Sequence, residues 1–314
     1  MALIFTDPVF LDHETGRHPE CPARLSSITD HLESSKLIDK VTRGKIRTAT
    51  EEELLLVHDR EHIQEIQKIT QSGGGRLDPD TVACPASYNV ALTAAGTTFA
   101  AVDEVMNGNH RHALCLIRPP GHHALPDRAM GFCLFNNVAL AARYAQKKHD
   151  VERVLIVDWD VHHGNGTQDI FYEDGSVYFF SAHRYPFYPG TGAERETGHG
   201  KGKGAIFNLP IAYGTPRKSY LEQFQTVLTQ AAEKCRPDLV LISAGFDAHK
   251  SDPIGSLDLE TEDFETLTKL VLSVADQYCG GKIVSLLEGG YNLKALAESV
   301  GCHLETLLAH EEKK

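Results

Sequence analysis

The sequence lacks several features that would place it at once in a large class of proteins. None of its apolar runs approaches the roughly 18 residues that a membrane-spanning helix needs. The first residues, M-A-L-I-F-T-D-P, carry no basic segment and reach Asp7 too early for the apolar core of a signal peptide. We therefore expect a soluble, cytoplasmic protein that is neither exported nor embedded in a membrane.

Paired cysteines and an excess of basic residues are also missing. The seven cysteines include no C-x-x-C pair, which argues against a cysteine zinc ribbon and is typical of thiols in a reducing compartment. The 31 Lys and Arg residues stand against 43 Asp and Glu, a formal net charge of -12. That charge disfavours direct nucleic-acid binding and would attract cationic substrates, although it is equally typical of a protein that charge merely keeps soluble.

No feature of the sequence divides the chain into parts. There is no internal repeat of 20 to 50 residues and no Pro- or Ser-rich linker. A chain of 314 residues can bury roughly 75% of its unfolded surface, so a core can form without disulfides. We predict one domain over residues 1–314, with a frayed E-E-K-K end.

The chain does contain an alternation of short apolar runs with longer segments of helical spacing. The expected strands are Ala2–Thr6, Ala113–Ile117, Val154–Asp158, Val177–Ser181, Ile206–Leu209, Leu239–Ser243 and Ile283–Leu287. The expected helices are Ser87–Asn107, Asn136–Lys148, Lys218–Lys234, Thr261–Cys279 and Leu293–Ala309. This alternation predicts an open α/β fold: a mostly parallel sheet of about eight strands with helices on both faces.

Polar motifs follow five of the expected strands. They are R-P-P-G-H-H-A, D-W-D-V-H-H-G-N-G, S-A-H-R-Y, S-A-G-F-D-A-H and L-E-G-G-Y-N. In open α/β sheets, ligands bind beyond the carboxyl ends of the strands. We therefore expect these five loops to converge on one site.

The D-W-D-V-H-H motif predicts a metal site. In an extended segment Asp158, Asp160 and His162 would point to one side and His163 to the other. Asp160 and His162 would form a chelate, and Asp247 is our choice for the third ligand of a catalytic zinc. An isolated D-x-H is more often a set of caps and hydrogen-bonded core groups, but its position beside four other polar loops favours a metal. Fe²⁺ is an alternative, because two carboxylates make the site rich in oxygen.

Two further motifs supply groups for proton transfer and for an oxyanion. His122 and His123 follow a rigid Pro-Pro-Gly turn, and a tandem pair of imidazoles beside a metal favours acid–base catalysis over the structural role typical of a lone histidine. Tyr291 lies in E-G-G-Y-N. Taken alone it is as readily an aromatic plug under a turn, but beside a metal its hydroxyl can donate to a developing oxyanion.

A narrow apolar channel is predicted from two aromatic motifs, A-M-G-F-C-L-F-N-N and R-Y-P-F-Y-P-G-T-G. Core packing explains these side chains nearly as well as a channel does. The candidate wall residues are Gly131, Phe132, Phe187 and Tyr188.

With these residues assembled, the sequence resembles the histone deacetylase family of the arginase-deacetylase superfamily, specifically its class II branch of zinc-dependent amidohydrolases. The resemblance runs from H-E-T-G-R-H-P-E-C-P-A-R-L to L-E-G-G-Y-N with the motifs in order. It implies the arginase-deacetylase fold and zinc bound by the three ligands chosen above. It also implies catalysis by the histidine pair and Tyr291, with Asp158 orienting His122.

The resemblance implies further sites. Structural K⁺ or Na⁺ would bind at Asp158, Asp160, His162, Ser181 and Ala182, with a second site around Phe171, Asp174 and Val177. Ile254 and Gly289 would belong to the substrate channel, and Asp80 would be the rim aspartate that holds the substrate backbone.

Three positions distinguish this chain within the family it resembles. Asn165 stands where class I members carry an aspartate that orients the second catalytic histidine, so the basicity of His123 is open. Tyr291 replaces the histidine of class II members that are weak on acetyl-lysine. Ile254 stands where polyamine-selective relatives carry an acidic residue.

The activity implied by the resemblance is hydrolysis of ε-N-acetyl-lysine in proteins or peptides, which releases acetate. Acetylpolyamines or another small acetylated amine are the alternative substrates. A catalytically silent acetyl-lysine binding module is the alternative from a different class.

Overall fold

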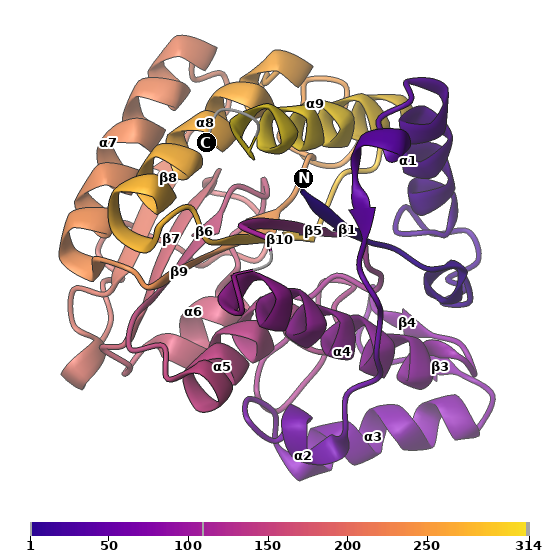
Figure 1. Ribbon diagram of the computed structural model, residues 1–314. Coiled ribbons are helices and arrows are strands. Elements are labelled where there is room, and N and C mark those ends of the chain that lie inside the picture. The colour runs from indigo at the N-terminus through magenta and orange to yellow at the C-terminus, as the bar shows by residue number, and fades with distance from the viewer. Residues whose placement is uncertain (1, 109, 312–314) are drawn as a thin grey trace.

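The computed structural model describes residues 2–108 and 110–311; of the end expected to be frayed, residues 312–314 lie outside the described part. One open sheet of eight strands runs through the middle of the domain (Figure 1). Its order is β2-β1-β5-β10-β9-β6-β7-β8, and each pairing between neighbours is parallel. The strands are β1 (Leu3–Phe5), β2 (Thr42–Arg43), β5 (His112–Cys115), β6 (Val154–Asp158), β7 (Val177–Arg184), β8 (Ile206–Ile211), β9 (Leu239–Ala244) and β10 (Ile283–Leu287). A separate antiparallel pair consists of β3 (Gly75–Arg76) and β4 (Val82–Ala83).

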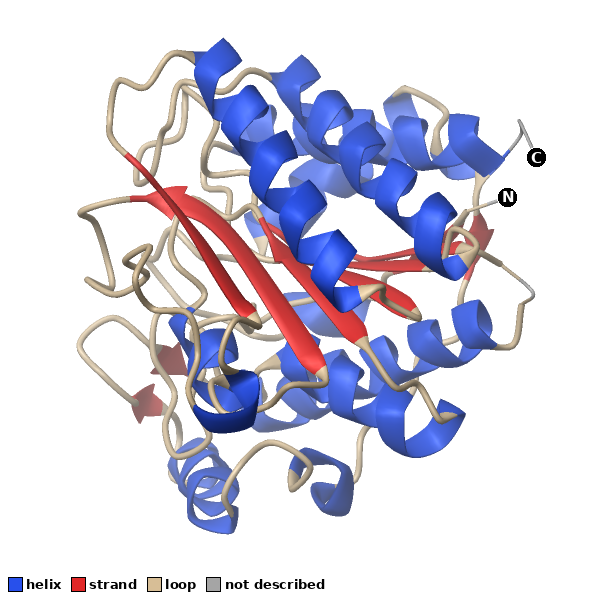
Figure 2. Ribbon diagram, turned by 90° about the vertical axis from the view of Figure 1, so that its left-hand side faces the viewer, coloured by secondary structure: helices blue, strands red, loops and turns tan. Residues whose placement is uncertain are grey.

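Helices cover both faces of the sheet (Figures 1 and 2). One layer contains α1 (Ala23–Ser34), α7 (Arg217–Cys235), α8 (Thr261–Cys279) and α9 (Leu293–Glu311). The opposite layer contains α2 (Glu51–Leu54), α3 (Arg60–Gln71), α4 (Ser87–Met106), α5 (Asn137–His149) and α6 (Asn165–Phe171). Three short 3-10 helices, η1 (Pro8–Leu11), η2 (Ile38–Lys40) and η3 (Gly200–Gly202), lie in the connections.

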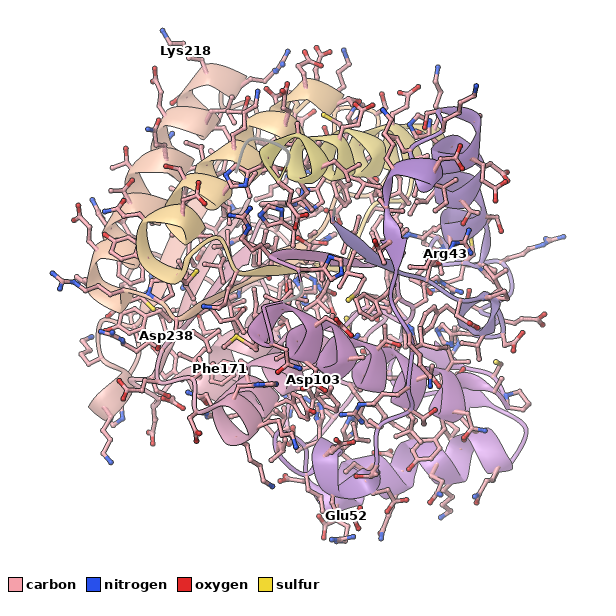
Figure 3. All side chains as sticks on the ribbon, viewed as in Figure 1. Arg43, Glu52, Asp103, Phe171, Lys218 and Asp238 are labelled. Atoms are coloured by element: carbon pink, nitrogen blue, oxygen red, sulfur yellow. The ribbon has the colours of Figure 1, made fainter. Side chains whose placement is uncertain are left out.

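The sheet is buried on both faces, as a parallel sheet between two helical layers must be. Every residue of β6, β9 and β10 is buried. Figure 3 shows the charged ends of Lys218 on α7 and Glu52 on α2 at the periphery, whereas Phe171 of α6 is wholly buried. Burying a side chain such as valine or leucine stabilises the fold by about 1.5–3 kcal/mol, so these central strands contribute strongly to the core.

The predicted elements agree with the structure in type, and they differ at the ends. β6, β10 and α8 have the predicted bounds, while β7 continues three residues further, to Arg184. The short edge strand β2 and the helices α1, α2, α3 and α6 were missing from the prediction. α6 contains Gly166 and Thr167, which are poor helix formers, so its sequence has little helical signal.

Two negative expectations concern the membrane and the thiols. Within residues 2–108 and 110–311, no helix is both long enough and apolar enough to cross a bilayer. All seven cysteines are free thiols, and four of them are buried.

Candidate active site and metal centre

The four central strands bring the polar motifs together. β10 lies between β5 and β9, and β9 lies between β10 and β6. Because these strands are parallel, the loops after β5, β6, β9 and β10 leave the sheet at the same edge. The motifs that carry His122, Asp160, Asp247 and Tyr291 therefore meet, although they are far apart in the sequence.

Asp160, His162 and Asp247 form the one group of metal-ligand type found among the described residues. One ligand atom from each lies within 4.8 Å of the others, and all three side chains are buried. His162 Nδ1 is 3.0 Å from Asp160 Oδ1 and 3.2 Å from Asp247 Oδ2. Tetrahedral zinc, with bonds of about 2.0–2.1 Å, separates its ligand atoms by roughly 3.3 Å.

The assumption of an extended segment after β6 was wrong. β6 ends at Asp158, and the chain then bends, because the His162 backbone N–H donates to Asp160 Oδ1 at 2.9 Å. The bend still brings Asp160 and His162 to the same place. His163 lies elsewhere, between Thr191 Oγ1 at 2.8 Å and Gln168 Oε1 at 3.1 Å.

Three features of the Asp160 and Asp247 carboxylates fit a divalent cation. Asp247 Oδ2 is buried and accepts no hydrogen bond, which is costly unless another group satisfies it. Two carboxylates face a single imidazole nitrogen, and burial together with the charge of Asp160 raises the pKa of Asp247 to about 7. A Cβ at Gly289 would lie 2.2 Å from Asp247 Oδ2 and 2.5 Å from Asp160 Oδ2, so only glycine leaves this space open.

Backbone amides orient the two aspartates. Val161 N donates to Asp247 Oδ1 at 2.8 Å, which leaves Oδ2 for the cluster. Gly289 N donates to Asp160 Oδ2 at 2.8 Å. Gly289, which the resemblance placed in the substrate channel, thus contacts the carboxylates of Asp160 and Asp247. Such contacts to a metal's ligands fix their orientation.

His122 has a carboxylate partner. Its Nδ1 is 2.9 Å from Asp158 Oδ2, and its Nε2 is 3.8 Å from Asp160 Oδ1. Burial alone would lower the pKa of His122, but attraction to Asp158 and Asp160 outweighs burial and raises the pKa to about 10. The geometry places Asp158 where the prediction had it, beside His122, and Asp158 Oδ1 accepts a hydrogen bond at 3.1 Å from the backbone N–H of Asp160, a candidate ligand.

His123 has a neutral partner. Its Nδ1 lies 2.7 Å from Asn165 Oδ1, at the start of α6. Burial, strengthened by repulsion from His122 and His162, holds the pKa of His123 well below its usual range. A Cβ at Gly131 would lie 2.3 Å from the His123 ring, and the φ of Gly131 is +56°, so glycine is required for this close approach.

Tyr291 is held by its backbone and by its ring. Its N–H donates to Asp252 Oδ2 at 2.7 Å, while Asp252 Oδ1 accepts from Ile254 N and Gly255 N. The Tyr291 ring meets Phe132 edge-on, with centroids 5.8 Å apart. Burial, with the charge of Asp247 close by, raises the pKa of Tyr291 well above its usual range. The phenol therefore stays protonated and remains a hydrogen-bond donor.

A narrow cavity of about 120 Å³ leads to these groups. Among residues 2–108 and 110–311, the larger cavities contain no second group of metal-ligand type. Tyr188 lies partly exposed at 37% and meets His123 edge-on. The cavity is lined by Asp80, His123, Gly131, Phe132, His162, Phe187, Tyr188, Ile254 and Tyr291.

The residues assigned to monovalent cations lie in two places. Asp158 and Ser181 are directly opposite each other in the pairing of β6 with β7, and Ala182 follows Ser181. At the second place an arginine is present: Arg143 pairs with Asp174 at 2.5 Å and lies over the Phe171 ring.

Two buried carboxylates near the site were missing from the sequence prediction. Glu288 Oε2 accepts hydrogen bonds from Gly121 N at 2.7 Å and His122 N at 3.2 Å. Glu20, in the N-terminal motif, binds Arg118 through two hydrogen bonds of 2.5 and 2.7 Å. In the sequence, Glu20 and Glu288 each stand out as a charged residue inside an otherwise apolar or turn-forming motif. Such a position indicates a buried carboxylate with a partner, but it does not identify the partner.

Comparisons with known proteins agree with this arrangement. The family model described as the histone deacetylase domain matches residues 18–307. "Histone deacetylase 14, chloroplastic" of Arabidopsis thaliana is 39% identical, over 98% of this chain and 77% of the relative. "Polyamine deacetylase HDAC10" of Homo sapiens is 39% identical, over 98% of this chain and 48% of the relative. The crystal structure of the HDA15 HD domain matches with a TM-score of 0.93 at 38% identity, covering 98% of this chain and 88% of that one.

Proposed function

The chain belongs to the histone deacetylase family, and on that premise we propose that it hydrolyses the acetyl amide of ε-N-acetyl-lysine in proteins or peptides. Membership makes it a hydrolytic enzyme with the arginase-deacetylase fold. The observation that carries the proposal is a buried Asp-His-Asp cluster at the end of a narrow channel, with two imidazoles of opposite character beside it.

Asp160, His162 and Asp247 would hold the zinc ion. When bound, the ion supplies Lewis-acid polarisation of a carbonyl and a lower pKa for water. The donor set of one nitrogen and two carboxylates also suits Fe²⁺, so metal analysis is part of the test.

The chain's own groups account for the proton transfers. His123, neutral beside Asn165, takes a proton from the attacking water. Tyr291 donates a hydrogen bond to the oxyanion that develops on the acetyl carbonyl. The C–N bond then breaks, His123 returns its proton to the departing lysine amine, and acetate is released. His122, held by Asp158, contributes positive charge beside the reacting atoms.

The channel favours an acyl-lysine side chain. Phe132, Phe187 and Ile254 provide apolar walls for a methylene chain, and Asp80 lies at the cavity where a substrate backbone would pass. The acetylpolyamine alternative is supported by the similarity to the human polyamine deacetylase. The apolar side chain of Ile254 disfavours it, because a polyamine carries positive charge into that part of the channel.

A substrate panel tests the proposal. The purified protein, loaded with zinc or Fe²⁺, is assayed for acetate release from acetyl-lysine peptides, acetylspermidine and acetylspermine, with and without a chelator. We expect chelator-sensitive turnover of the peptides, with kcat/KM at least tenfold above the polyamines. Equal or faster turnover of the polyamines would move the assignment to the alternative substrate, and release of no acetate from any substrate would refute the activity.

A further inference from the structure

We propose that Arg184 is a specificity-determining residue, whose guanidinium fixes one wall of the substrate channel by holding both Phe187 and the Ile254 loop. The inference rests on the proposed deacetylase function and concerns how that site limits the width of its substrate.

Arg184 is placed by the sheet. It is the last residue of β7, and its N–H donates to Val161 O at 2.8 Å. In the pairing of β7 with β8 it lies opposite Ile211, the last residue of β8. Tyr213 follows Ile211 by two residues, so the parallel register brings Tyr213 beside Arg184.

The guanidinium lies over two aromatic rings. Arg184 Cζ is 4.2 Å from the centroid of the Phe187 ring and 4.4 Å from the centroid of the Tyr213 ring. Both distances are inside the roughly 6 Å range of cation–π contacts. Tyr213 is 66% exposed, the most exposed large hydrophobic side chain among the described residues.

The Arg184 side chain also contacts the loop that carries Ile254, the second part of the channel wall. Arg184 Nη1 donates to Gly255 O at 2.9 Å, and Gly255 follows Ile254, which lines the cavity. The loop is tightly seated there, since a Cβ at Gly255 would lie 2.4 Å from Val161 Cγ1. Within the described residues Arg184 has no carboxylate partner. Its guanidinium is held instead by the ring contacts of its planar face and by the hydrogen bond that it donates.

Phe187 connects Arg184 to the candidate active site. Its ring stacks on the His162 ring, with centroids 5.4 Å apart and planes 17° apart. Phe187 is therefore held between Arg184 outside and His162 inside, and it cannot turn without losing one of them. Because Phe187 and Ile254 both line the cavity, one side chain sets the position of both. Removal of the guanidinium should widen the channel.

Arg184→Lys tests the inference. Lysine keeps the charge and a donor but loses the planar face and the fixed fork of arginine. We expect KM for an acetyl-lysine peptide to rise roughly tenfold, the size of effect that a pocket gains or loses with small changes in apolar fit. We expect kcat to change less than about threefold, since no catalytic group is altered. The ratio of kcat/KM for the acetyl-lysine peptide to kcat/KM for the butyryl-lysine peptide should fall by a similar factor.

Arg47→Lys is the matched control. Arg47 also lies over two rings, at 5.0 Å from Phe99 and 5.4 Å from Tyr144, and it is not among the residues that line the channel cavity. Unlike Arg184 it also pairs with a carboxylate, Glu53, at 2.8 Å. This control removes the same kind of stack and should leave KM and acyl preference unchanged. Thermal unfolding of both variants checks that they fold. If Arg184→Lys does not fold, Tyr213→Ala takes its place, because it removes one of the two ring contacts of Arg184 at the surface. That variant must then raise KM for the acetyl-lysine peptide.

The outcomes separate this inference from the proposed function. If the wild type turns over acetyl-lysine while Arg184→Lys retains both KM and acyl preference, the role assigned to Arg184 is overturned and the deacetylase activity stands. If the wild type releases no acetate from any acyl-lysine, the proposed function fails, and the inference fails with it.

Discussion

The charge state of the two adjacent histidines, His122 and His123, depends on the side chain beside each ring. The rings of His122 and His123 have centroids 4.0 Å apart, yet one faces the Asp158 carboxylate and the other the Asn165 amide. The carboxylate favours a charged imidazole, whereas the amide has no net charge to offset burial. The two residues are therefore suited to different roles. A divalent cation at the candidate ligand cluster would lower both pKa values, because it repels both imidazolium forms.

At the residue scale, Tyr291→Phe removes one hydroxyl from the site. Loss of a single oxyanion donor typically lowers turnover roughly 100-fold to 1000-fold, and we expect kcat on acetyl-lysine peptides to fall by that amount. Steady-state kinetics at saturating substrate measure it. Metal content should match the wild type, because Tyr291 is not among the ligands. Full activity in this variant would contradict the role given to the phenol.

We expect Glu20 to contribute to stability at acid pH. Burial would raise its pKa, but attraction to Arg118, with His13 and Arg24 adding to it, outweighs burial and lowers the pKa from 4.5 to about 2. A carboxylate with a depressed pKa stabilises the fold above its unfolded pKa, and that contribution, about 3 kcal/mol here, is lost as the pH falls from about 4.5 towards 2.

Glu20→Gln tests this contribution. We expect the free energy of unfolding at pH 7 to fall by about 3 kcal/mol or more, because Arg118 loses its partner while it remains buried. Urea unfolding at pH 7 and at pH 3 provides the measurement. The variant should lose less stability than the wild type between the two pH values; equal losses would show that Glu20 is not the titrating group.

At the scale of elements, the end of β10 acts on the loop after β5. Glu288 follows β10 directly and accepts from the backbone of Gly121 and His122, while its other oxygen accepts from Ser243 Oγ of β9 at 3.2 Å. Three strands are thereby linked at the edge where the site forms. The position of the histidine pair depends on this link, since no other side-chain acceptor is found for those two amides within the described residues.

Removal of this link should displace the histidines. We expect Glu288→Ala to lower kcat/KM by about 100-fold, the loss typical of a displacement near 1 Å. Glu288→Gln keeps an acceptor oxygen for the two amides and should recover most of the activity. Paired kinetics of the two variants decide the question, and equal damage in both would mean that the charge of Glu288 matters rather than its acceptor.

At the scale of the whole molecule, metal binding should stabilise the fold. The candidate ligands come from the loops after β6 and β9, so a bound ion would join segments that separate on unfolding. A ligand present at 100 times its Kd adds about 2.7 kcal/mol. Calorimetry with and without zinc should therefore show a higher Tm for the loaded protein. Asp247→Asn should abolish most of that shift, and an unchanged shift would place the metal elsewhere.

The sequence by itself determined the fold class, and its motifs named the candidate groups that the structure brings together. Apolar runs such as Val154–Asp158 and Ile283–Leu287 predicted strands with the observed bounds, because a strand buried on both faces leaves a continuous signal. Helix α8 was equally clear. Short or Gly-containing elements such as β2 and α6 left no such signal, and their formation depends on packing against the finished sheet.

Only the tertiary structure decided how the groups work together. The sequence motifs named His122 and His123, but their different character follows from contacts with Asp158 and Asn165, 36 and 42 residues away along the chain. The tertiary structure also revealed that Glu288 supports the histidine loop, and that Gly289 makes room for the carboxylates of Asp160 and Asp247. Such contacts join residues distant in sequence, and local patterns of polarity carry no information about which distant group will lie beside a given one.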